Sequence, residues 1–183
     1  MDLKKRAGLI RLILMDVDGT LTDGTLTVLP DGEELKSYHV RDGMGILMAH
    51  LVGLETGIIT GKTSKALEKR VSRLKMKFLF QGILNKYAVL QKILSETGLS
   101  ADAVAYIGDD LGDLPVIKAV GLSAAVADAH PLVKQHSHMI CSLPGGSGAV
   151  REFIEFILET QGHDWDSIET KLLALQRLTD LQS

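Results

Sequence analysis

The sequence has little cysteine, no long apolar run and no excess of basic residues, and each absence excludes a class of protein. The single cysteine, Cys141, cannot form a disulfide within the chain, which favours a reducing compartment. The formal net charge is −3, and lysine and arginine form no cluster of the kind that binds nucleic acid. No stretch approaches the ~18 consecutive apolar residues of a membrane-spanning helix. We therefore expect neither nucleic acid nor a membrane as a partner.

The N-terminal stretch MDLKKRAGLIRLILM resembles a secretory signal, because basic residues precede apolar ones. The resemblance fails, since Arg11 interrupts the apolar run, no small-residue cleavage site follows, and the run ends at Asp16. We therefore expect a cytoplasmic protein. Its 183 residues, 45% of them hydrophobic and 23% charged, fit one compact globular domain.

Short apolar runs alternate with longer amphipathic segments, which is typical of βαβ units and a parallel sheet. The runs are apolar throughout, as expected for strands covered on both faces. The predicted fold class is therefore α/β, a three-layer α/β/α, Rossmann-like arrangement around a mostly parallel sheet. The predicted strands are 11–16, 56–60, 77–80, 103–108 and 122–127, with 138–141 at an edge, and the predicted helices are 43–53, 63–74, 85–97, 111–119 and 147–161.

Residues 25–40 break this alternation, because two strand-like runs flank the turn sequence Pro30-Asp31-Gly32. We expect a β-hairpin that projects beyond the sheet as a flap over the site. We expect a single domain over residues 9–162, followed by a C-terminal tail, residues 163–183. Apolar residues of the tail recur at helical spacing and predict an amphipathic helix, packed either on its own domain or on a neighbouring subunit. These residues are Trp165, Ile168, Leu172, Leu175 and Leu178.

Chemically useful side chains follow the carboxyl ends of the predicted strands, where open α/β sheets bind ligands. Asp16 and Asp18 follow the first strand, and Thr60 ends the second. Lys86 opens the helix after the third strand, and Asp109 follows the fourth. Crowded carboxylates raise one another's pKa unless a cation lies among them. A hard divalent cation with oxygen ligands, Mg²⁺ by default, is the natural remedy.

This set of residues has the parts needed for phosphate transfer. With the metal bound, Asp16 stays ionised and can act as a nucleophile. Lys86 and the Thr60 hydroxyl can offset the charge of a substrate phosphate. Asp18 can give a proton to a leaving alcohol and later take one from water.

The motifs DVDGT, IITG, Lys86 and GDDLGD resemble the four motifs of the haloacid dehalogenase superfamily, in the right order and on the right elements. The resemblance implies a haloacid dehalogenase-like fold and a phosphoaspartyl mechanism. Asp16 would attack phosphorus, Asp18 would be acid and then base, and Thr60 and Lys86 would hold the phosphate. The implied metal ligands are Asp16, Asp18 and Asp109. The acid at Asp18 favours a phosphatase over a dehalogenase.

The roles of Asp110 and Asp113 stay open at this point. One of them could orient Lys86 or bind the metal through water, and either could cap the following helix.

The superfamily usually covers its site with a cap domain inserted after the first or third strand, and neither gap here can hold one. From about residue 11 to 162 the chain is similar to the 3-deoxy-D-manno-octulosonate 8-phosphate phosphatases of the capless branch. The resemblance implies hydrolysis of that sugar-acid phosphate in lipopolysaccharide precursor synthesis. It also implies a homotetramer in which neighbouring subunits close each site. The stretches that carry it are GEELKSYHVRDGMGI, QGILNK, YIGDDLGDLPV, GLSAAVADAHP and GGSGAVRE.

The same resemblance implies which residues contact the substrate. Arg41 suits a carboxylate, which a guanidinium grips with two hydrogen bonds. The chain has Lys62 and Leu47 where the family usually has arginine. Lysine keeps the positive charge but lacks the forked geometry of a guanidinium, and leucine lacks both the charge and the geometry. The alternative substrate that the resemblance implies is a nine-carbon sugar-acid 9-phosphate, because related capless enzymes act on such compounds. The implied contacts are Asp18, His39, Val40, Arg41, Asp42, Gly43, Thr60, Gly61, Lys62, Arg70 and Lys86.

Two alternatives belong to other classes of protein. A phospho-receiver domain has a similar sheet and acidic Mg²⁺ pocket, but its phosphorylated aspartate follows the third strand. Here the acids follow the first strand, and Asp18 provides a built-in acid and base. A non-catalytic scaffold is the second alternative, and the intact set of Asp16, Asp18, Thr60, Lys86 and Asp109 argues against it.

Overall fold

The computed structural model describes residues 2–180, with side chains up to residue 175. Its central layer is a six-stranded sheet in the order β5-β4-β1-β6-β7-β8, in which every neighbouring pair is parallel. This confirms the predicted α/β fold, including the edge strand. The strands are β1 (Leu12–Met15), β4 (Glu55–Ile59), β5 (Phe78–Phe80), β6 (Val104–Gly108), β7 (Leu122–Ala125) and β8 (Met139–Ile140).

The strand β1 lies in the middle of the sheet and sets the position of the site. Its four residues are all buried, because β4 and β6 flank it and helices cover both faces. Met15 at its end is in register with Ile58 of β4 and Ile107 of β6. Residues that follow these three strands therefore lie side by side at one edge of the sheet.

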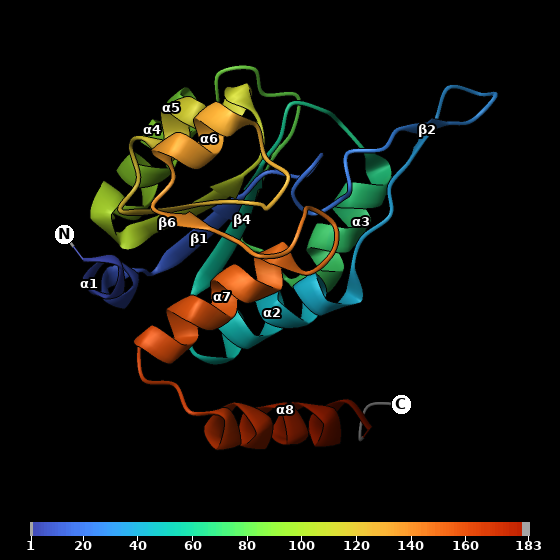
Figure 1. The fold of residues 1–183 in the computed structure, drawn as a ribbon. Helices are drawn as coiled ribbons and strands as arrows, with labels where there is room; N and C mark the ends of the chain where they lie inside the picture. Colours follow the sequence, from blue (N-terminus) through green and yellow to red (C-terminus); the bar gives the residue numbers. More distant parts are fainter. Residues whose placement is uncertain (1, 181–183) are drawn as a thin grey trace.

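Two groups of helices cover the sheet, with α4, α5 and α6 on one face and α2 and α7 on the other (Figure 1). The helix α1 packs against α7, and α3 lies next to α2. The bounds are α1 (Leu3–Leu9), α2 (Val40–Leu51), α3 (Lys65–Leu74), α4 (Lys86–Thr97), α5 (Leu114–Ile117), α6 (Pro131–His136), α7 (Ala149–Thr160) and α8 (Trp165–Asp180), with short 3₁₀ turns η1 (Ala101–Ala103) and η2 (Leu111–Asp113).

Four helical segments differ from the sequence prediction. The helices α1 and α6 were not expected, and α1 precedes the domain start expected at residue 9. The helix expected over 111–119 is instead the turn η2 followed by the short helix α5, which carries a proline in its first turn. The helix α2 begins at Val40, three residues earlier than expected, because His39 caps it by accepting from the Arg41 backbone N–H.

The flap forms as predicted, with β2 (Thr27–Val28) antiparallel to β3 (Glu34–Leu35). It projects away from the sheet (Figure 1). Gly32 in its turn has a φ of +84°, a conformation that side chains disfavour. The flap exposes apolar side chains to solvent, namely Leu26, Val28 and Leu35.

The C-terminal tail forms the predicted helix, α8, which packs against α2. Ile168 is buried, and Lys171 Nζ donates a hydrogen bond of 3.1 Å to the Leu51 carbonyl. The tail thus packs on its own domain. The Leu178 side chain lies outside the described residues. Over the part of the chain described, no helix combines the length and apolar character needed to cross a membrane.

Candidate active site

Three carboxylates converge where β1 and β6 end. Asp16 directly follows β1, Asp109 directly follows β6, and Asp113 closes the turn η2. One oxygen of each carboxylate lies within 4.8 Å of the other two. Asp16 and Asp113 are buried. The topology therefore brings together acids that are separated by almost a hundred residues.

Lys86 lies among these carboxylates as the first residue of α4. Its Nζ is 2.7 Å from Asp16 Oδ1 and 2.6 Å from Asp113 Oδ1. Burial lowers the pKa of Lys86, but the attraction of Asp16 and Asp113 outweighs that effect, so the pKa is raised. The side chain is thus a fixed ammonium group at the centre of the site.

The structure separates the roles of Asp110 and Asp113. Asp113 Oδ1 accepts from Lys86 and from the Tyr106 hydroxyl, each at 2.6 Å. Its Oδ2 accepts from the backbone N–H groups of Asp109 at 3.0 Å and Asp110 at 3.2 Å. Asp110 is exposed and caps η2, its Oδ1 accepting from the Leu111 N–H at 2.8 Å. Asp113 therefore orients Lys86, and Asp110 is a helix cap.

The cluster has the chemistry of a site for a hard cation. Burial, followed by the charge of Asp113, raises the pKa of Asp16 to about 6, against the opposing effect of Lys86. Burial, followed by the charges of Asp16 and Asp113, raises the pKa of Asp109 to about 8. Asp16 Oδ1 contacts Lys86 Nζ at 2.7 Å and has no further hydrogen bond among the described residues. The raised pKa values of Asp16 and Asp109 indicate carboxylates whose charge is poorly compensated, which fits a site for Mg²⁺.

Gly19 explains why glycine follows the paired acids. Its φ is +90°, and a Cβ at this position would lie 2.1 Å from Asp109 Oδ2. Thr20, next in the chain, donates from Oγ1 to Asp109 Oδ1 at 3.1 Å. Any larger residue at Gly19 would therefore displace Asp109 from the cluster.

The Asp18 carboxylate lies outside the three-acid cluster and forms an ion pair with Lys36, the residue after β3. The Lys36 side chain is 3% exposed and that of Asp18 25%. Lys36 was missed by the sequence reasoning. It lies in the GEELKSYH stretch, but no spacing or periodicity connects a lysine of a hairpin with an acid of another loop.

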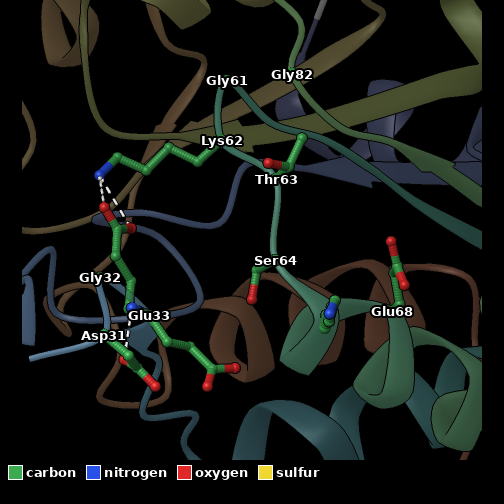
Figure 2. A pocket seen from close by; sticks show the side chains of 11 residues that line it. Asp31, Gly32, Glu33, Gly61, Lys62, Thr63, Ser64, Glu68 and Gly82 are labelled. Carbon is green, nitrogen blue, oxygen red and sulfur yellow. Dashed lines mark hydrogen bonds and ion pairs between the residues drawn. The ribbon is translucent and has the colours of Figure 1, made fainter. Parts of the chain in front are cut away.

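Thr60, Gly61 and Lys62 continue from β4 beside the cluster. Thr60 is buried, whereas Gly61 and Lys62 line an open pocket of about 930 Å³ between the flap and the start of α3 (Figure 2). Lys62 Nζ reaches across this pocket and contacts both carboxylate oxygens of Glu34, at 2.9 and 3.1 Å. The Lys62 ammonium is thus already paired with the flap.

Some of the residues expected to contact the sugar acid are exposed, and others are buried. Val40 and Arg41 are exposed at the start of α2. Asp42 is buried, and its Oδ1 accepts from the Arg151 N–H of α7 at 2.9 Å, so it fastens α2 to α7. Leu47 is half-buried on α2.

Arg70 reaches from α3 to the start of α2. A Cβ on Gly43 would lie 2.4 Å from Arg70 Nη2, so the glycine makes room for the guanidinium. The guanidinium carbon is 5.7 Å from the centre of the Tyr38 ring, within cation–π distance. Four of the expected residues, His39, Asp42, Gly43 and Arg70, line one small cavity and so lie together.

Comparison with known proteins decides the family. Residues 76–154 match the haloacid dehalogenase-like hydrolase family. The 3-deoxy-D-manno-octulosonate 8-phosphate phosphatase KdsC of Escherichia coli K12 is 44% identical over 161 residues, which cover 88% of this chain and 86% of that protein. The chain belongs to the KdsC family. The expected superfamily and capless branch are thereby confirmed.

Solved structures of the KdsC family agree with this fold. A probable YrbI family phosphatase from Pseudomonas syringae is 45% identical and superimposes with a TM-score of 0.90, covering 93% of this chain and 97% of that one. The 3-deoxy-D-manno-octulosonate 8-phosphate phosphatase of Moraxella catarrhalis, solved with a magnesium ion, a phosphate ion and KDO, is 33% identical. Its TM-score is 0.89, with the same coverage of 93% and 97%.

Proposed function

We propose that this chain is a Mg²⁺-dependent phosphatase that hydrolyses 3-deoxy-D-manno-octulosonate 8-phosphate to the sugar acid and phosphate, a step of lipopolysaccharide precursor synthesis. The observation that carries the proposal is the group of Asp16, Lys86, Asp109 and Asp113 at the ends of β1 and β6. The activity named for the E. coli relative and the ligands of the Moraxella structure support it. An enzymatic site of this kind also favours a phosphatase over a receiver domain or an inactive scaffold.

Asp16 and Asp109 are the proposed metal ligands within the cluster. Asp18 stays in the proposed ligand set through the family resemblance alone, because its carboxylate pairs with Lys36 and lies outside the three-acid cluster. Asp113 is already engaged by Lys86, Tyr106 and two backbone N–H groups, which suits a supporting role. When bound, Mg²⁺ supplies positive charge that offsets the charges of the carboxylates and the substrate phosphate.

The protein side chains divide the chemistry between them. A carboxylate oxygen of Asp16 attacks phosphorus, the phosphorus–oxygen bond to the sugar breaks, and Asp18 gives its proton to the departing oxygen. Water then attacks the phosphoaspartate, Asp18 takes the proton from that water, and phosphate leaves with Asp16 restored. Lys86 and Thr60 hold the phosphoryl oxygens throughout.

The sugar acid would occupy the space between the flap and the α3 end of the site. Arg41 and Arg70 are the proposed partners of its carboxylate and hydroxyl groups, with His39, Val40, Gly43 and Gly61 as further contacts. Lys62 replaces a forked guanidinium with a single ammonium that Glu34 already holds. This replacement is the observation that favours the second candidate substrate, a nine-carbon sugar-acid 9-phosphate.

We also propose a cytoplasmic homotetramer in which neighbouring subunits close each site. The exposed apolar side chains of the flap support an interface there, because Val28 is 61% and Leu35 51% exposed. An open pocket beside the active site likewise leaves room for a neighbouring subunit to complete it.

The test is a screen of phosphate release from eight- and nine-carbon sugar-acid phosphates and from p-nitrophenyl phosphate, with Mg²⁺ or with EDTA. The expected result is Mg²⁺-dependent release with the highest kcat/KM for the eight-carbon substrate, and none above background for Asp16→Asn. A higher kcat/KM for the nine-carbon compound would select the second candidate. Residual turnover by a folded Asp16→Asn variant would refute the nucleophile.

A further inference from the structure

Lys36 belongs to the flap, but its side chain is buried and contacts the loop that carries Asp18. It follows β3 by one residue, and its ammonium forms an ion pair with Asp18 Oδ1. Most of the flap is exposed, whereas the Lys36 side chain is 3% exposed. The flap therefore sends one charged side chain into the site, where it contacts Asp18.

The burial of Lys36 makes its pairing with Asp18 a strong positional constraint. An ammonium group removed from water is costly unless an anion and hydrogen-bond acceptors compensate it. Asp18 Oδ1 is the acceptor that the structure provides. Movement of the flap away from the loop would separate the two charges, so the position of the flap and the orientation of Asp18 stabilise each other.

The other oxygen of Asp18 faces a different environment. The Asp18 side chain is 25% exposed, and Oδ2 accepts no hydrogen bond from any side chain described. Tyr38 lies nearby, with its hydroxyl buried and without a hydrogen bond among residues 2–175. Burial, and then the charge of Asp18, raises the pKa of Tyr38 to about 12, so this neighbour remains a neutral phenol. Oδ2 is thus the oxygen left to exchange a proton with a substrate.

We propose that Lys36 is a positioning residue for Asp18. It holds Oδ1 so that Oδ2 is free to face the leaving-group oxygen, and it makes proton transfer depend on the position of the flap. The proposal rests on the assignment of Asp18 as acid and base under the proposed function. Lys36 acts through Asp18 and need not touch the substrate.

The flap makes a second ion pair with the core, which provides a matched control. Glu34 of β3 pairs with Lys62, and these side chains are 32% and 40% exposed. Glu34→Gln therefore weakens the attachment of the flap without touching Asp18. A loss that comes only from a loosened flap would appear in both variants and would not depend on the leaving group.

The experiment measures kcat/KM, which reports the steps up to departure of the leaving group, for wild type, Lys36→Met and Glu34→Gln. The substrates are p-nitrophenyl phosphate, whose leaving group departs without a proton, phenyl phosphate and the sugar-acid phosphate. General acid catalysis is worth about 10²–10⁴-fold, so Lys36→Met should lose about 10- to 100-fold on the sugar-acid phosphate and under about threefold on p-nitrophenyl phosphate. Glu34→Gln should leave the ratio of kcat/KM for phenyl phosphate to that for p-nitrophenyl phosphate as in wild type, and the sugar-acid phosphate is left out of this control because Glu34 holds Lys62, a proposed sugar contact.

The second readout is a double-mutant cycle with Asp18→Asn on phenyl phosphate. If Lys36 acts through Asp18, adding Lys36→Met to Asp18→Asn should change kcat/KM by less than about twofold. Equal losses on all three esters, or the same loss in both backgrounds, would overturn the proposal while leaving the proposed function intact. A wild-type protein with no Mg²⁺-dependent hydrolysis would overturn both. Circular dichroism shows whether each variant is folded, and Lys36→Arg, which keeps the charge, should retain the wild-type dependence on the leaving group.

Discussion

Asp113→Asn removes the acceptor that holds Lys86, and its effect can be worked out from four hydrogen bonds. Asp113 is 1% exposed and accepts from Lys86 Nζ and the Tyr106 hydroxyl at one oxygen. It accepts from the backbone N–H groups of Asp109 and Asp110 at the other. All four groups are donors. An asparagine has one acceptor oxygen and one NH₂ group, so two of these donors would face another donor.

The expected loss of stability follows from these contacts. Each buried donor left unsatisfied costs about 1–3 kcal/mol. Breaking a buried ion pair by removing one partner costs about 3–5 kcal/mol. Lys86 keeps Asp16 at 2.7 Å, so the loss should lie near the lower end of that range, at about 3 kcal/mol. Such a loss is a large part of the ~5–15 kcal/mol by which domains are usually stable.

Urea unfolding followed by circular dichroism measures this loss as a shift of the midpoint at constant slope. The control is Asp110→Asn, three residues away, because Asp110 is exposed and asparagine caps a helix about as well as aspartate. That variant should lose less than about 0.5 kcal/mol. A loss under about 1 kcal/mol for Asp113→Asn would refute the view that Asp113 is the buried anchor of Lys86.

Three further predictions concern recognition, the metal and assembly. Arg41→Ala should lower kcat/KM on the sugar-acid phosphate by about tenfold or more and leave kcat/KM on p-nitrophenyl phosphate nearly unchanged. The control is Arg73→Ala, because Arg73 is also exposed. Equal losses on both substrates would show that Arg41 does not recognise the sugar acid. Without metal, in EDTA, the pKa values of Asp16 and Asp109 are raised to about 6 and about 8. Above pH 3.8 the folded state therefore holds protons that the unfolded state has lost. The free energy of unfolding should then fall as pH rises from 3.8 towards 8. Mg²⁺ at 100 times its Kd should restore about 2.7 kcal/mol at pH 8, and unfolding curves that respond to neither pH nor Mg²⁺ would argue against the acidic cluster as the metal site. Light scattering should give a tetramer, and a fully active monomer would contradict closure of the site by neighbours.

The sequence predicted the sheet well because its strands are buried and their pattern is local. All four residues of β1 are apolar and buried, and paired acids mark its end. The helix ends were less predictable. The helix predicted from Gly43 begins at Val40, and Gly43 and Gly45 both lie inside it, where they permit close contact with Arg70 and Arg151. Tertiary packing there outweighs the low helix propensity of glycine.

Two missed helices have different causes. The helix α1 is only seven residues long and rich in basic residues, so its sequence resembled a signal segment more than a helix, and packing against α7 stabilises it. The helix α6 did have a signal, because Pro131 occupies its first turn after the capping residue His130.

The candidate site likewise contains residues whose positions the sequence could predict and residues whose positions it could not. Strand order alone places Asp16 beside Asp109, and the start of α4 delivers Lys86, so these residues could be expected to meet. Lys36 could not, because its contact with Asp18 depends on how the flap folds back over the loop. The inward turn of Asp42 depends likewise on the position of α7.

The decisive measurement is phosphate release from 3-deoxy-D-manno-octulosonate 8-phosphate by wild type and Asp16→Asn, each in Mg²⁺ and in EDTA. Wild type in Mg²⁺ should show saturable release, and the other three conditions should give background rates. Release that continues in EDTA, or that Asp16→Asn sustains, would contradict the proposed function.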